Sequence, residues 1–88
     1  MSAEKQDYDS LSKDIKSKLN EELTEDLVRL NKAKENLTSL MDGMSNTKIP
    51  NFDSHNFIIE TIRTQLEVSL DNLENAIYQT NDILEKVK

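Results

Sequence analysis

The chain has one glycine and one proline, Gly43 and Pro50, and both lie close to its middle. Glycine and proline are the residues that interrupt helices most strongly, and the segments on either side are rich in helix-forming residues. The sequence therefore predicts one domain with two uninterrupted helices. We expect a flexible leader over residues 1–7, helix one over residues 8–44, a polar connector over residues 45–53, and helix two over residues 54–88.

Helix two carries a heptad pattern between residues 57 and 87. Its repeating positions alternate in steps of four and three, at Leu66, Leu70, Leu73, Ile77, Thr80, Leu84 and Val87. On a helix this spacing forms a stripe that faces a partner helix when the two helices wrap around each other. The pattern predicts a seam between helix two and another helix.

Helix one carries a different apolar pattern. Its apolar residues are Tyr8, Leu11, Ile15, Leu19, Leu23, Leu27, Leu30, Ala33, Leu37 and Met41, and every step between residues 11 and 27 is four. Residues eleven apart recur at Tyr8, Leu19, Leu30 and Met41, which is typical of a helix that runs nearly straight. We therefore expect the two helices to differ in pitch and to pack as a bundle rather than as a regular zipper.

The predicted fold is all-α, a long antiparallel helical hairpin of the coiled-coil or helical-bundle type, with helices of about 30 to 37 residues. Gly43 occupies the position where a left-handed residue ends many helices. Asp53 is the expected N-cap of helix two, with Phe52 and Phe57 packed across it as a hydrophobic staple.

Helix two has more apolar residues than one seam can use. Ile59 and its neighbours crowd the first turns, and further apolar residues, including Val68 and Tyr78, lie at or beyond the edge of the stripe. Burial of a Leu, Ile or Phe side chain contributes roughly 1.5 to 3 kcal/mol, so we expect further helices to cover them. The predicted protein interface consists of Phe57, Ile58, Ile62, Leu66, Leu70, Leu73, Ile77, Ile83, Leu84 and Val87.

The residues suggest no catalytic chemistry. The chain has no cysteine, and its single histidine, His55, lacks the additional ligands that a zinc site needs. No phosphate-binding loop or catalytic triad can be assembled, so we expect neither an enzyme nor a cofactor, metal or small-molecule substrate. The net charge of −6 argues against direct binding of nucleic acid. No signal segment and no apolar run of about 20 residues is present, so we expect no membrane insertion and a cytoplasmic or nuclear location.

In its size, its acidity and its paired long helices, the chain resembles the small subunits of three kinds of assembly. These are fungal kinetochore rings of the DASH type, lysosome-related organelle biogenesis complexes, and Mediator. The resemblance implies a structural subunit of a hetero-oligomeric complex whose partners are other α-helical proteins. Two alternatives remain: a homodimeric four-helix bundle, and a small regulator that binds one protein through the acidic face of helix one, at Glu21, Glu22, Glu25 and Asp26.

Overall fold

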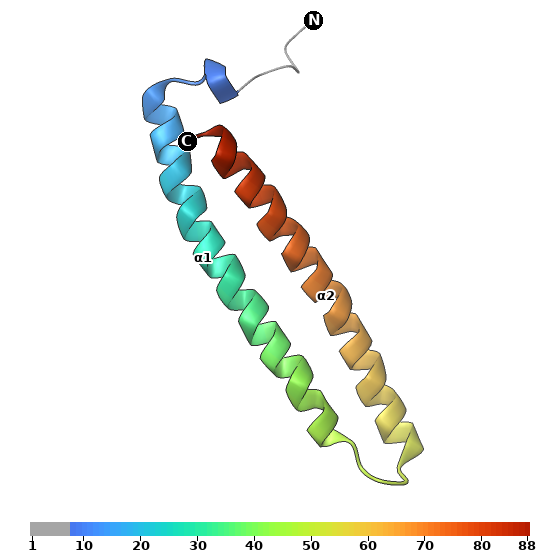
Figure 1. Cartoon of the computed structure of the whole chain (residues 1–88). Helices are drawn as coiled ribbons and strands as arrows, with labels where there is room; N and C mark the ends of the chain where they lie inside the picture. Colours follow the sequence, from blue (N-terminus) through green and yellow to red (C-terminus); the bar gives the residue numbers. More distant parts are fainter. Residues whose placement is uncertain (1–7) are drawn as a thin grey trace, which may run out of the picture.

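Two long helices lie side by side and run in opposite directions in the computed structural model, which describes residues 8–88 (Figure 1). Helix α1 spans Lys13–Met44 and helix α2 spans Asp53–Lys86, with short 3-10 helices η2 at Tyr8–Ser10 and η3 at Ser45–Thr47. Residues 8–88 contain no strand, and the molecule measures 62 × 29 × 12 Å. The predicted all-α hairpin is confirmed. The expected leader, residues 1–7, lies outside the described residues.

Helix α1 begins five residues later than expected, at Lys13 rather than at residue 8. Ser12 is its N-cap, because its backbone is extended and its Oγ accepts a hydrogen bond from the Ile15 N–H at 3.2 Å. Tyr8 lies in η2, where the Lys86 ammonium is 5.8 Å from the centre of its ring. This cation–π contact joins η2 to the end of α2.

Helix α1 does not end at a left-handed glycine, so that prediction is wrong. Gly43 has no positive φ, and the helix continues through it to Met44 before tightening into η3. Among the described non-glycine residues, Asn51 alone has a positive φ, of 66°. The chain therefore reverses direction at a turn after η3, and not at Gly43.

The predicted cap of α2 is also wrong by one residue. Phe52 is the N-cap, it makes no side-chain capping hydrogen bond, and Asp53 is already helical. The Phe52 N–H donates to the Ile49 carbonyl at 3.1 Å, and this turn brings Phe52 to the start of the helix. The Phe52 ring lies against His55, with ring centres 5.6 Å apart, whereas Phe57 is 72% exposed and forms no staple.

Nine of the ten apolar positions predicted for helix one are partly or fully buried, and a series of partly or fully buried positions at heptad spacing also runs along α1. On α1, Ile15 is 49% exposed, and long polar side chains take up seam positions that an apolar pattern passes over. Their aliphatic stems pack in the seam while the charged or amide groups reach water. The partly or fully buried heptad series of α1 is Lys16, Asn20, Leu23, Leu27, Leu30, Lys34, Leu37, Met41 and Met44.

The seam of α2 matches the predicted heptad and extends further towards its start. All seven predicted positions are partly or fully buried, and Ile59 and Arg63 continue the series. Met41, Ile59 and Val87 are the only apolar side chains among the described residues that are buried outright. Two helices thus form a continuous seam without an enclosed core.

Candidate helix-docking surface

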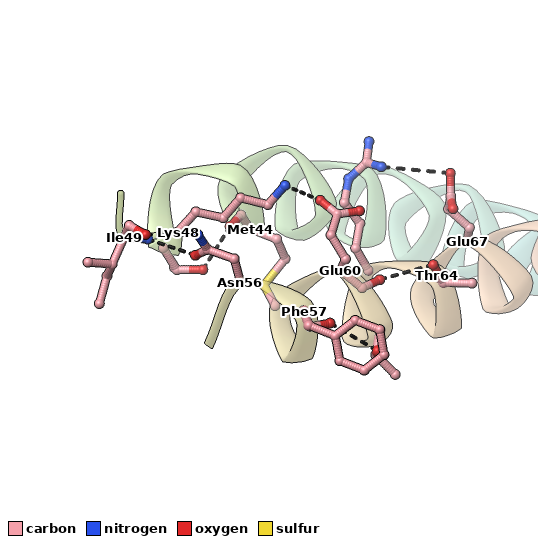
Figure 2. Close-up of polar contacts among 11 residues, drawn as sticks. Met44, Lys48, Ile49, Asn56, Phe57, Glu60, Thr64 and Glu67 are labelled. Carbon is pink, nitrogen blue, oxygen red and sulfur yellow. Dashed lines mark hydrogen bonds and ion pairs between the residues drawn. The ribbon is translucent and has the colours of Figure 1, made fainter. Parts of the chain in front are cut away.

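The closed end of the hairpin is a tight corner held by one asparagine (Figure 2). Pro50 and the positive φ of Asn51 occupy the central positions of a turn from Ile49 to Phe52, in the arrangement of a type II turn. The Asn56 side chain accepts a hydrogen bond from the Ile49 N–H and donates one to the Ile49 carbonyl, both at 2.8 Å. Both backbone polar groups of Ile49 are therefore satisfied by α2.

Charged and aromatic side chains add to this corner. The His55 ring nitrogen Nε2 lies 2.7 Å from the Thr47 carbonyl, so His55 links η3 to α2. Lys48 forms an ion pair with Glu60. The hydrogen bond from Lys48, together with its positive charge, holds the pKa of the Glu60 carboxyl below its ordinary value of 4.5. His55 and Glu60 thus have structural roles in joining the connector to α2.

Residues 8–88 contain no cluster of three or more side chains suited to bind a metal ion. One surface hollow lies along α1, open to solvent and lined by Asn31, Lys34, Glu35, Thr38, Ser39 and Asp42. Within the same residues, neither long helix is apolar enough over a sufficient length to cross a membrane.

Polar residues interrupt the seam at several levels. Lys34 of α1 pairs with Glu74 of α2 at 3.3 Å, an ion pair between the two helices. Arg63 occupies a seam position near the corner, where its guanidinium lies 3.9 Å from Glu67. Its Nε is a buried polar atom without a hydrogen-bond partner in the described part of the chain. The unsatisfied donor of Arg63 lowers the stability that the seam provides, because burial of a donor without a partner costs free energy.

The predicted interface residues divide into two groups. Leu66, Leu70, Leu73, Ile77, Leu84 and Val87 lie in the seam that α1 covers, so the hairpin itself uses them. By contrast, Phe57, Ile58 and Ile62 are exposed, and Ile83 is partly buried at the edge of the seam. The second group is the part of the predicted interface that remains accessible to another protein.

The two sides of the hairpin that flank the seam differ in character. When two heptad helices pair in opposite directions, the residues that directly precede every second seam position lie on one side of the seam in both helices. The residues that directly follow the remaining seam positions lie on the other side. On this side, which we term the apolar side, all but Asp26 and Ser69 are apolar: Leu19, Asp26, Ala33, Leu40, Ile62, Ser69, Ala76 and Ile83. The opposite, polar side is formed by Ser17, Thr24, Asn31, Thr38, Glu60, Glu67, Glu74 and Asn81.

The corner exposes a second group of large apolar side chains. Ile49 and Phe52 are 45% and 50% exposed, although they stand next to the tightly bonded turn. Figure 2 shows the Phe57 ring on the side of α2 away from Lys48. We term Ile49, Phe52 and Phe57 the corner cluster. The sequence pattern places Phe52 in a staple and Ile49 in the connector, and it selects only Phe57 of this cluster as an interface residue.

Comparisons of the chain with protein-family models, with curated proteins and with solved structures found no match.

Proposed function

We propose that the chain is a non-enzymatic assembly subunit of a hetero-oligomeric complex, in which its two helices join the helices of other proteins in a shared bundle. The observation that carries the proposal is the exposed apolar surface of the hairpin, on its apolar side and in its corner cluster. Contiguous apolar surface on a small soluble protein is typical of a protein–protein contact.

The balance of burial supports the same proposal. Only Met41, Ile59 and Val87 are fully buried among the described apolar residues, whereas Leu40, Phe57 and Ile58 are each more than half exposed. Burial of one such side chain contributes roughly 1.5 to 3 kcal/mol. A partner helix that covers several of them therefore adds several times that free energy to the stability of the folded chain. Chains of this size gain stability from partners because they bury little surface alone.

The proposal includes a cytoplasmic or nuclear location. Its support is the resemblance in size, acidity and paired long helices to small subunits of kinetochore, organelle-biogenesis and transcription assemblies.

Affinity purification of the tagged full chain from its native cells, with quantitative mass spectrometry, tests the proposal. The informative variant is Ile49→Gln with Phe57→Gln, which removes apolar surface at the corner and leaves the backbone bonds of Ile49 to Asn56 in place. We expect the wild-type chain to recover helical proteins in a fixed ratio, and this variant to recover at least about tenfold less of them.

The matched variant for that experiment is Glu21→Gln with Glu22→Gln, which changes two exposed acidic residues of α1. We expect it to recover the same proteins as the wild type. If the acidic variant loses the partners and the corner variant keeps them, the chain is instead a regulator that binds through helix one. Recovery of no protein in a fixed ratio contradicts assembly with other subunits.

A further inference from the structure

Next to the seam, α2 carries a second row of residues at heptad spacing. The row steps by four and three through Ile58, Ile62, Gln65, Ser69, Asn72, Ala76, Gln79 and Ile83. None of these residues is charged, although charged residues make up 32% of the chain. All except Ala76 and Ile83 are exposed, so the row faces solvent along most of its length. We term this row the uncharged stripe.

The absence of charge distinguishes this row from two other rows beside the seam. The other flank of α2 places Glu60, Glu67 and Glu74 beside the seam. The corresponding row of α1 contains Glu22, Asp26 and Arg29, which are charged. Residues at the centres of protein interfaces are depleted of charge, and the stripe shares this one property with a contact surface.

The charge of the whole chain limits which face can form a contact between two copies. At a net charge of −6, two copies repel each other, and this repulsion is smallest when they meet through a face that carries no like charges. The uncharged stripe is such a face, and it is available over about seven turns of α2. A second copy of the chain can approach it without burying an unpaired charge.

The stripe is also complementary to itself when one copy is reversed. An antiparallel pairing gives four pairs between the two copies: Ile58 with Ile83, Ile62 with Gln79, Gln65 with Ala76, and Ser69 with Asn72. Branched apolar residues then meet at both ends, and the long Gln65 faces the small Ala76. A two-fold symmetric interface requires this kind of self-complementarity, because each contact occurs twice.

The position of the stripe along the helix agrees with such a pairing. Its midpoint lies between residues 70 and 71, close to the middle of Asp53–Lys86. Two reversed copies of α2 therefore overlap along nearly their whole length. We propose that two copies of this chain form an antiparallel dimer through the uncharged stripe of α2, which makes a four-helix bundle from two hairpins.

This inference deepens the proposed function and rests on it. Because each hairpin closes at the corner, the antiparallel dimer carries one corner cluster at each of its two ends, where other subunits can bind. The dimer uses the stripe, which includes the α2 residues of the apolar side, whereas the corner cluster consists of Ile49, Phe52 and Phe57. The two contacts can therefore be tested separately.

Sedimentation equilibrium of the purified full chain tests the dimer. We expect a mass of twice the 10.1 kDa chain at high concentration. The variant Gln65→Glu with Gln79→Glu places charges in the stripe and should raise the dissociation constant at least about tenfold. The matched variant Thr64→Glu with Asn81→Glu adds the same charge outside the stripe, at exposed positions, and should leave the dissociation constant unchanged within about twofold. Far-UV circular dichroism checks that every variant keeps its helix content.

A mixing experiment identifies the contacting face directly. The chain with Gln65→Lys and Gln79→Lys should pair with the chain that carries Glu at the same positions, and the mixture should regain a dimer mass. Repulsion within each variant and attraction between them are expected only where the stripes of two copies meet.

Crosslinking reports the direction of the pairing, and the absence of cysteine from the chain makes single-cysteine variants clean probes. Asn72→Cys lies near the expected two-fold axis and should crosslink to itself with a short bismaleimide. Two copies of Ile58→Cys should lie about 37 Å apart along the axis, at 1.5 Å per residue, and should not. Efficient crosslinking of both variants would show a parallel dimer and overturn the proposal.

A wild-type chain that is monomeric at every concentration would overturn the proposed dimer, as would a dimer unaffected by charges in the stripe. Neither result bears on whether the corner cluster recovers other subunits, so a failed dimer and a failed assembly function are distinguishable.

Discussion

At the scale of single residues, Asn56 joins the connector to α2. Its side chain satisfies both backbone polar groups of Ile49, at 2.8 Å each, from the first turn of α2. The turn through Pro50 and Asn51 follows immediately, so the corner closes in a single geometry. A short polar side chain thereby sets where the two helices meet, which leaves Ile49 and Phe52 exposed to other proteins.

The substitution Asn56→Ala removes both hydrogen bonds. Each contributes about 0.5 to 1.5 kcal/mol, so we expect the free energy of unfolding to fall by about 1 to 2 kcal/mol. Urea unfolding at one fixed protein concentration measures the change. Asn75→Ala is the matched control, because it makes the same substitution at an exposed position of the same helix and should not destabilise the chain by more than about 0.5 kcal/mol. Equal losses in both variants would show that the Asn56 bonds do not hold the corner.

At the scale of the helices, partly or fully buried residues recur at heptad spacing along the seam on both α1 and α2. The polar residues Lys16, Asn20 and Lys34 occupy seam positions of α1, and Lys34 pairs across the seam with Glu74. The result is a pair of long helices that are aligned along their length but weakly held, with one apolar side and one polar side.

The substitution Gly43→Ala tests whether α1 continues through this residue. It has a helical backbone, and a Cβ added there meets no atom within 4 Å. Because glycine is about 0.5 to 1 kcal/mol less favourable than alanine inside a helix, Gly43→Ala should raise the free energy of unfolding by that amount. Urea unfolding of the two chains provides the comparison. A loss of stability would indicate that Gly43 needs a left-handed conformation and that the helix ends there.

The sequence was sufficient to predict the two helices, their antiparallel pairing and the seam of α2. The long segments without Gly or Pro and the regular heptad from Leu66 to Val87 leave few other folds open. It was insufficient for the seam positions of α1 that polar residues occupy, because an apolar pattern selects Ile15 and passes over the stems of Lys16 and Lys34. The caps were mispredicted because the bonds from Asn56 to Ile49 connect residues seven apart, and no local motif contains them.

The sequence indicates only the apolar part of the candidate interface. Exposed apolar residues such as Phe57 and Ile58 stand out in the sequence. The uncharged stripe does not, because its middle consists of Gln, Ser and Asn, which are ordinary surface residues until the seam fixes which face they occupy.

At the scale of the whole molecule, the hairpin is long and only 12 Å thick in its smallest dimension. Two helices bury each other along one line and leave the rest of their apolar side open. We expect the stability of such a molecule to rise when a second copy or another subunit covers that side. We infer that the isolated hairpin is incomplete.

Thermal unfolding of the purified chain across roughly a hundredfold range of concentration tests that claim most directly, because association raises the stability of the folded state by mass action. Circular dichroism follows the loss of helix, and light scattering gives the mass at each concentration. We predict a midpoint that rises by several degrees across the range, together with a mass that increases from one chain to two. A high, cooperative midpoint that does not change with concentration, with the mass of a single chain throughout, would contradict the account.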